Sequence, residues 1–151
     1  MRPQRLAVLL ASVCLTWTAP ASAQVVNTSN ALTVTCAAAN RAGPTGQLDI
    51  AIVQGAVHDA VQAIQGRFEP YFYDDPSRLG AGSEEAAVAA ATWGVLRGLY
   101  GNNVACLANV QNPSITYAGD PGLQAGNAPA QAFLPLFRPI LTLPTDPFTG
   151  G

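Results

Sequence analysis

The chain has 151 residues, of which 49% are hydrophobic and 11% are charged, and it contains seven arginines, nine acidic residues, one histidine and no lysine. This length suits one domain. The formal net charge of −2, without any basic run, gives no reason to expect nucleic acid or an anionic membrane surface as a partner.

The N-terminus has the pattern of a secretory signal peptide. Two arginines precede the apolar run 6–17, and Ala21-Ser22-Ala23 then supplies a small-x-small cleavage site. We therefore expect residues 1–23 to be removed and the protein, which would start at Gln24, to be periplasmic or secreted. Five arginines and nine acidic residues then remain, so the net charge becomes −4. The run is shorter than the ~20 residues of a bilayer span; the alternative is an uncleaved anchor.

Two helices are predicted next along the chain. Asn27-Thr28-Ser29 can cap a short helix over 31–41, and a turn follows at 43–46. A central helix is expected over about 47–65, because apolar residues recur there at steps of three and four. They are Ile50, Val53, Val57, Ala60 and Ile64.

An aromatic connector follows the central helix. Gly66 is expected to cap that helix, and Pro70 prevents its continuation. The rings of Phe68, Tyr71 and Tyr73 are expected to fold back over the core, since an aromatic side chain can bury roughly 150–250 Å².

The next helix is predicted over 83–100. Ser83 can accept from its free N-terminal amides, and Gly101 ends it. A short helix over 103–110 and a break at 112–114 are expected to follow.

A last helix is predicted from Asp120-Pro121, which resembles an N-cap followed by proline at the first helical position, to Phe137. Pro129 and Pro135 oppose a regular helix, at about 3 kcal/mol each in an interior. We therefore expect this helix to be kinked or broken.

No segment alternates for long as a strand does, so the predicted fold class is all-α. We expect a small bundle of about four or five helices around the central helix, with the helical domain over 24–138. Residues 139–151 are rich in proline and glycine and read as a linker or a truncated end. The bundle is therefore expected to be a partial domain of a larger α-helical protein.

Two cysteines follow the signal peptide, Cys36 and Cys106. In an oxidising compartment such a pair is often a disulfide, and a loop of about 70 residues would then add roughly 4 kcal/mol at most. The alternative is two buried free thiols, because two cysteines alone fix no geometry.

Two polar residues of the central helix are candidates for a functional site. Asp59 borders an apolar face and is expected to be partly buried in a structural ion pair with Arg67 or Arg97. His58 is adjacent, but neighbouring helical residues do not face each other, so we interpret it as a hydrogen-bonded helix histidine. It has no second histidine with which to bind a metal.

Other residues that could form a site are better explained structurally. Glu69, Asp74 and Asp75 do not match a calcium loop and are interpreted as a solvated surface. Trp93 and the connector rings are expected in the core. The sequence has no glycine-rich phosphate loop and no Gly-x-Ser-x-Gly motif, so no catalytic, cofactor-binding or metal-binding residue is predicted.

The stretch LDIAIVQGAVHDAVQAIQGRFEPY, residues 48–71, combines an apolar helix, a small-x-x-Asp-Ala-Val-x-Ala-Ile core and a Gly-Arg-aromatic-Glu-Pro-Tyr exit. With the alanine-rich helix that follows, it resembles the N-terminal helical region of exported vanadium-dependent haloperoxidase-like proteins of the type 2 phosphatidic-acid-phosphatase superfamily. The resemblance covers roughly residues 28–138 and is specific in its first stretch. It implies an all-helical fold and, in the intact relative, vanadate or phosphate held by a lysine and two arginines.

The resemblance also implies two catalytic histidines and a Pro-Ser-Gly-His motif, neither of which this chain has. Arg138-Pro139 has the family's dipeptide, but Gln131 stands where the lysine is required, and a neutral amide cannot replace an ammonium. We therefore expect a catalytically incomplete scaffold without a cofactor of its own, which packs against a missing C-terminal helical half or self-associates. The alternative is a self-sufficient small periplasmic binding protein stapled by Cys36–Cys106.

Overall fold

The computed structural model describes residues 21–141 except 42, 76–79, 103 and 109, with no side-chain description for 21–22 and 137–141. Most of the expected signal peptide and all but the start of the expected linker lie outside these residues. The elements in chain order are α1 (Ala21–Asn40), α2 (Pro44–Gln65), α3 (Glu84–Tyr100), the 3-10 helix η2 (Ala105–Leu107), α4 (Pro113–Thr116) and α5 (Gly122–Leu141). The described residues include no strand, which confirms the all-α class.

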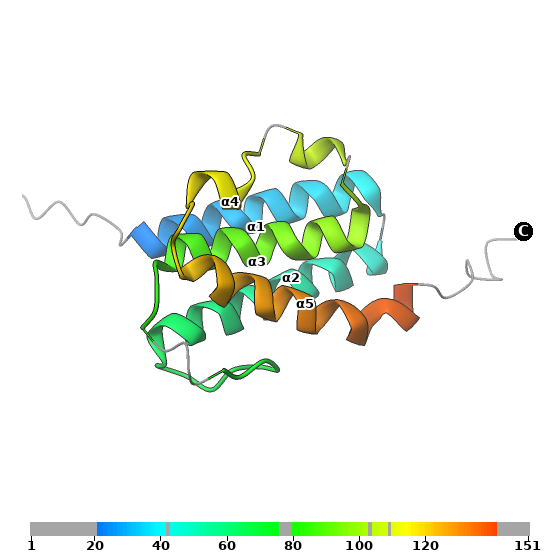
Figure 1. The fold of residues 1–151 in the computed structure, drawn as a ribbon. Coiled ribbons are helices and arrows are strands. Elements are labelled where there is room, and N and C mark those ends of the chain that lie inside the picture. The colour runs from blue at the N-terminus through cyan, green and yellow to red at the C-terminus, as the bar shows by residue number, and fades with distance from the viewer. Residues whose placement is uncertain (1–20, 42, 76–79, 103, 109, 142–151) are drawn as a thin grey trace, which may run out of the picture.

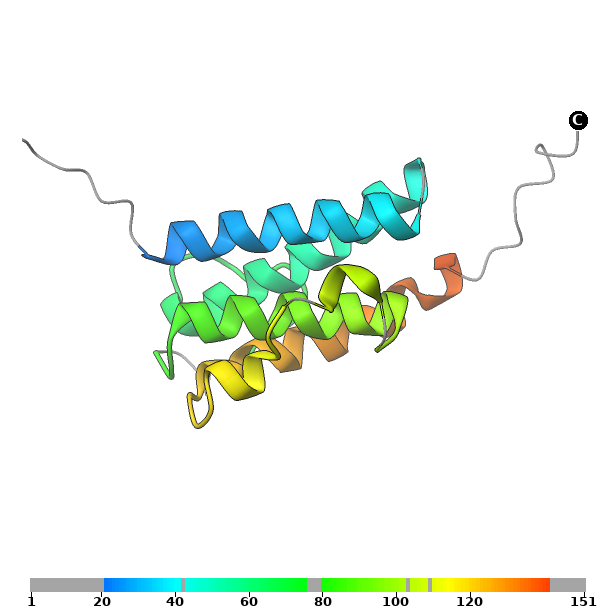
Figure 2. The same cartoon turned by 90° about the horizontal axis from the view of Figure 1, so that it is seen from above.

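The four long helices form a bundle in which α1, α3 and α5 run in one direction and α2 runs in the other (Figures 1 and 2). α2 packs against each of the other three, as the sequence predicts for a central helix. α3 and α5 pack side by side, and they are parallel because both run in the same direction. The chain joins them by a crossover, residues 101–121, which returns along the bundle and carries η2 and α4.

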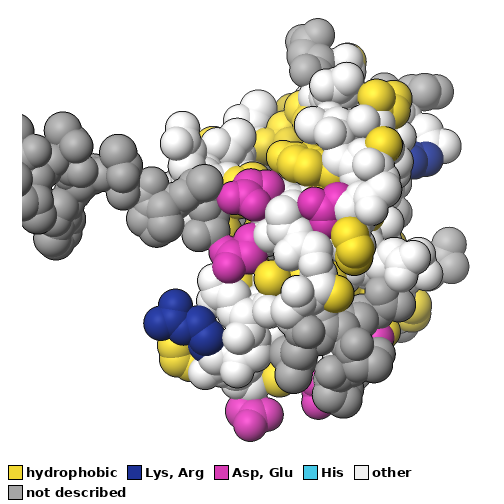
Figure 3. Space-filling model, turned by 60° about the vertical axis from the view of Figure 1, so that its left-hand side comes forward, with side chains coloured by type: hydrophobic (Ala, Val, Ile, Leu, Met, Phe, Trp, Pro, Cys, Tyr) yellow, Lys and Arg dark blue, Asp and Glu magenta, His cyan; other side chains and the backbone are white. Residues whose placement is uncertain are grey.

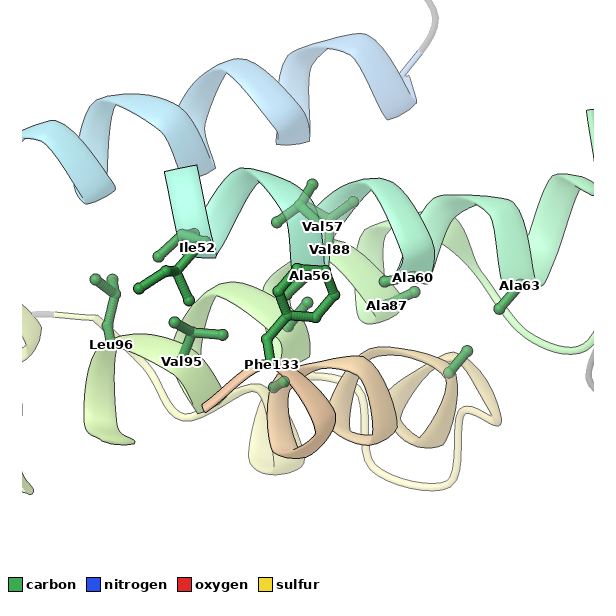
Figure 4. Packing of buried hydrophobic residues seen from close by; sticks show 14 of the residues in the cluster. Ile52, Ala56, Val57, Ala60, Ala63, Ala87, Val88, Val95, Leu96 and Phe133 are labelled. Carbon is green, nitrogen blue, oxygen red and sulfur yellow. The ribbon is translucent and has the colours of Figure 1, made fainter. Parts of the chain in front are cut away.

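The core lies between α2, α3 and α5 (Figure 4). Two adjacent faces of α2 are buried, because its apolar residues occupy two faces rather than one stripe. Phe133 of α5 fills the space that Gly55 leaves on α2, where a Cβ would come within 2.5 Å of its ring. The other large contributors are Ile52, Val53, Val88, Val95 and Leu96.

Small residues let α3 and α5 approach closely. A Cβ at Gly126 would overlap with the carbonyl oxygen of Ala87, and one at Gly94 would lie 2.9 Å from the Cβ of Ala130. Gly98 likewise receives the side chain of Leu134. The alanine and glycine content of these two segments is therefore a packing requirement, since a larger side chain would force the helices apart.

α1 begins ten residues before the predicted start, so the prediction that Asn27-Thr28-Ser29 caps it is wrong. The physical reason is that the hydroxyls inside α1 bond backward to the preceding turn. Thr28, Thr33 and Thr35 donate to the carbonyls four residues earlier, at 2.8–3.0 Å. A hydroxyl satisfied in this way is compatible with a helix interior.

α2 starts at Pro44, three residues earlier than expected, since proline is favoured in the first turn of a helix. Its predicted end is confirmed: Gly66 is left-handed, and its N–H donates to the carbonyl of Gln62.

α3 confirms the predicted cap at Ser83 and the end at Gly101. The helix predicted over 103–110 is reduced to η2, and the break expected at 112–114 is instead the start of α4. There the side chain of Asn112 accepts from the N–H of Ser114 at 3.0 Å, with Pro113 in the first turn.

α5 extends over Gly122–Leu141, so the expectation of a broken helix is wrong, and the expected boundary at 138/139 lies inside this helix. Each proline removes one backbone hydrogen bond. Pro129 is fully buried, and α5 packs along both α2 and α3, so tertiary contacts outweigh the loss of helix propensity.

One carboxylate joins the starts of α3 and α5. Asp120 accepts from the hydroxyl of Ser83 at 2.6 Å, from its backbone N–H at 3.0 Å and from the N–H of Gly122 at 2.8 Å. The Ser83 hydroxyl in turn caps α3 by accepting from the N–H of Ala86. The hydrogen bonds from Ser83 and Gly122 hold the pKa of Asp120 below its usual value.

Cys36 and Cys106 form a disulfide with a Cα–Cα distance of 5.3 Å, so the predicted pairing is confirmed. It joins the C-terminal half of α1 to η2. The crossover that separates α3 from α5 is thereby attached covalently to α1, against which η2 packs.

We predict that Gly126→Ala destabilises the fold by about 1–3 kcal/mol, although alanine is the better helix former. The added methyl group meets the backbone of Ala87, which cannot move as a side chain would. Urea unfolding measures the change, and Gln131→Ala, at an exposed position of α5, is the matched control. Equal stability of the two variants would contradict the close approach of α3 and α5.

We also predict a pH-dependent effect of Asp120→Asn. A carboxyl whose pKa is lowered by folding adds stability that is present above the unfolded-state value of about 3.9 and is lost as the pH falls through the folded value. The variant should therefore be less stable than the parent at pH 7, and the difference should shrink below pH ~4. Thermal unfolding at several pH values tests this, with the exposed Asp74→Asn as control. A difference independent of pH would refute the assignment.

Candidate functional site

The most specific arrangement of polar side chains lies where the connector, residues 66–75, folds back on α2. Three α2 side chains bind its backbone. His58 Nε2 is 3.1 Å from the carbonyl oxygen of Glu69, and Gln62 Oε1 accepts from the N–H of Phe68 at 2.7 Å. The third is Asp59, which binds the residues that follow. The interpretation of His58 as a hydrogen-bonded helix histidine is confirmed, with Nε2 as the donor because a carbonyl can only accept.

Asp59 has no exposed surface, and both of its oxygens accept from the connector backbone. Oδ1 accepts from Tyr71 N–H at 2.5 Å, and Oδ2 accepts from Phe72 N–H at 2.9 Å and Tyr73 N–H at 2.6 Å. Hydrogen bonds to a charged acceptor are short and about twice as strong as neutral ones. They stabilise a carboxylate in the interior, where no cation among the described residues pairs with it.

The prediction that Asp59 forms an ion pair with Arg67 or Arg97 is therefore wrong. Arg67 is exposed, and Arg97 donates to the side-chain oxygen of Asn102 at 2.7 and 2.9 Å. The reason is proximity: the connector turns directly back along α2 and places three N–H groups at Asp59. Sequence reasoning considered charged side chains as partners and did not consider the backbone.

The connector holds its rings outward, so the prediction that they cover the core is wrong for most of them. Phe68 is 68% exposed, Tyr71 81% and Phe72 52%. The inner edge of Phe72 contacts Phe133 in an edge-to-face arrangement with ring centroids 5.6 Å apart. The backbone is fixed by α2 while the apolar side chains remain accessible.

A hollow of about 530 Å³ lies between the end of α2 and the connector. Its lining includes charges of both signs, from Arg67, Glu69, Asp74 and Asp75, beside the ring of Tyr73. Figure 3 looks toward the end of the bundle where α3 and α5 begin and shows acidic side chains close together among hydrophobic ones. Glu84 and Glu85 belong to this end, in the first turn of α3.

A second buried carboxylate, which sequence reasoning missed, lies near the other end of α2. Asp49 has no exposed surface, and its Oδ2 accepts from the hydroxyl of Tyr100 at 2.7 Å and lies 3.4 Å from Arg41 Nε. The Arg41 guanidinium also lies over the Tyr100 ring, 5.9 Å from its centroid. Burial, followed by the hydrogen bond to Asp49, raises the pKa of Tyr100. This cluster joins the α1–α2 turn to the end of α3.

The arrangement of these groups favours a structural role over catalysis. His58 and Asp59 are adjacent, but each binds a different part of the connector rather than the other. Within the described part of the chain, no three His, Cys, Asp or Glu side chains are grouped so that they could hold a metal ion. None of the helices described here is both long and apolar enough to cross a membrane.

We predict that Asp59→Ala lowers the free energy of unfolding by roughly 3 kcal/mol, because three amides lose a buried charged acceptor. The connector should then detach from α2, and trypsin should cleave faster after the exposed Arg67. Urea unfolding and mass spectrometry of the tryptic products measure the two effects. The control is Asp74→Asn, an exposed acid of the same connector. An unchanged cleavage rate at Arg67 would show that Asp59 does not anchor the connector.

Comparisons with protein-family models, with curated proteins and with solved structures find no match to this chain. The resemblance to vanadium-dependent haloperoxidase-like proteins therefore stays a prediction from the sequence.

Proposed function

We propose that this helical domain is a non-catalytic scaffold of an exported vanadium-dependent haloperoxidase-like or type 2 phosphatase-like protein. In this proposal the connector is the surface that packs against further helices, either those of a catalytic half or those of a second copy. The carrying observation is that Phe68, Tyr71 and Phe72 are largely exposed on a backbone anchored by Asp59.

Anchored aromatic side chains suit association for two physical reasons. Burying a large apolar side chain contributes roughly 1.5–3 kcal/mol. Because α2 already holds the connector backbone, little further conformational entropy is lost when a partner covers the rings. Aromatic residues in such positions are typical anchors of protein interfaces.

A catalytic role has little support from the residues present. The sequence has no lysine to neutralise an oxyanion and one histidine, where the family's chemistry requires two. That histidine already binds the connector carbonyl of Glu69. The domain accordingly carries no cofactor in this proposal, and vanadate belongs to the intact relative.

A second candidate function is a self-sufficient periplasmic binding protein, and the Cys36–Cys106 disulfide favours it. A staple between α1 and the crossover stabilises a small domain that does not rely on a further helical half. The two candidates differ in the fate of the exposed rings, which stay free in solution in the second.

The proposed scaffold role predicts that the purified chain self-associates through the connector when no other partner is present. Sedimentation should show a concentration-dependent increase in mass, and an apolar dye should bind. The double substitution Phe68→Ser/Tyr71→Ser should reduce both, because it removes the two most exposed rings of the connector.

Ile115→Ser is the matched control, since Ile115 is 65% exposed on α4, on the opposite side of the bundle (Figure 1). It should leave sedimentation and dye binding as in the parent chain. A parent chain that stays monomeric and binds no dye would contradict the scaffold role. It would favour the second candidate, the self-sufficient binding protein.

A further inference from the structure

A groove of about 760 Å³ lies where α1 ends and α2 begins, at the end of the bundle opposite the start of α3 (Figure 1). We call it the α1–α2 groove. Its lining combines small residues with the aliphatic side chains of Val34 and Ile50. Val34 is 45% exposed although it is apolar. A benzene ring fits a cavity of ~150 Å³, so the groove has room for an aromatic side chain and the backbone that carries it.

The sequence builds this groove from a tight turn between two antiparallel helices. A Cβ at Gly46 would come within 2.7 Å of the carbonyl oxygen of Arg41, so the start of α2 lies very close to the end of α1. Ala37 and Ala38 of α1 also line the groove, and their short side chains leave it open. Arg41 further holds the turn through its ion pair with Asp49 of α2. The groove is therefore preformed.

The charge at the surface of this groove is positive. Arg41 is the one charged residue among the described residues that line it. Its partner Asp49 has no exposed surface, so the guanidinium is the charged group that a docked molecule meets. Arg97 lies in the last turn of α3, at the same end of the bundle, and binds the neutral side chain of Asn102.

The connector belongs to the opposite, acidic end of the bundle. Six acidic side chains lie on the connector and on the adjacent starts of α3 and α5 (Figure 3): Glu69, Asp74, Asp75, Glu84, Glu85 and Asp120. Arg67 is the one arginine side chain that the structure describes in this region. The two ends of the bundle therefore carry charge of opposite sign.

These charges favour one way for two copies to associate. Contact between two connectors would bring the two acidic ends together, and like charges at an interface oppose binding. Contact between a connector and an α1–α2 groove instead brings acidic residues near arginines. It also covers exposed aromatic rings with exposed aliphatic side chains.

We propose that the α1–α2 groove of one copy receives the connector rings of a second copy. The inference rests on the proposed function, since it takes the connector as the packing surface and names the surface that it meets. Tyr71 suits this role best, because its side chain is 81% exposed and its backbone N–H is held by Asp59. The contact is heterologous, since the two copies contribute different surfaces.

Sedimentation of the full chain with substitutions in the groove tests this contact. Val34→Asp places an acid at an exposed position of the groove and should weaken self-association by about tenfold or more. Gln47→Glu changes only the charge of an exposed groove residue and should weaken it by about threefold. An acid is favourable near the N-terminus of α2, so this second variant keeps the test valid if the first fails to fold.

Ile115→Asp is the matched control. It makes the same kind of change at an exposed aliphatic residue, but on α4 and outside the groove. It should change self-association by less than about twofold.

A mixing experiment separates this contact from one between two connectors. Phe68→Ser/Tyr71→Ser removes two rings but keeps the groove, whereas Val34→Asp alters the groove but keeps the rings. Each variant alone should sediment as a monomer where the parent associates. An equimolar mixture should form a complex with one copy of each, because the intact connector of one variant can enter the intact groove of the other.

Groove variants that associate as tightly as the parent would overturn the proposed contact, and so would a mixture that keeps the mass of the monomer. If the connector variant has then lost self-association while the groove variants keep it, the scaffold role stands and only the contact with the groove is wrong. A parent chain that is itself monomeric would contradict both.

Discussion

A carboxylate buried at position 59 sets the path of the chain between α2 and α3. It cannot stay in the interior without donors, and the backbone of residues 71–73 provides them. The connector must therefore turn back along α2, where the N–H of Gly80 also reaches the carbonyl of Ile64 at 2.9 Å. Gln65 then donates to Glu84 at 2.6 Å, which fixes the start of α3 beside the end of α2. This path also explains why the connector rings are exposed. The backbone N–H groups of the connector face α2, so the aromatic side chains are left on the outer side.

Much of the fold could be predicted from the sequence, because its signals are local. The central helix, the Ser83 cap and the glycines that end α2 and α3 depend on periodicity and on residues a few positions apart. The errors arose where distant contacts overrule local preference. Pro129 is tolerated in α5 because the helix is packed between two others, and α1 extends past its apparent cap because its hydroxyls bond backward.

The candidate site was harder to predict than the fold. Asp59 was correctly singled out as a buried residue, but its partners are backbone amides, which have no signature in composition or charge. The path of the crossover was not foreseen either, because it depends on contacts between segments that are far apart in the sequence. Only the pairing of Cys36 with Cys106 hinted that this segment lies against α1.

The parallel arrangement of α3 and α5 has a consequence for how the chain folds. α2 and α3 are neighbours in sequence and antiparallel, so they can associate early at small loop-closure cost. α5 can join α3 only after residues 101–121 have travelled back along the bundle. Oxidation of Cys36 and Cys106 shortens that search, because it holds the middle of the crossover against α1. Oxidation of these two thiols would thus speed the last step of folding as well as stabilise its product.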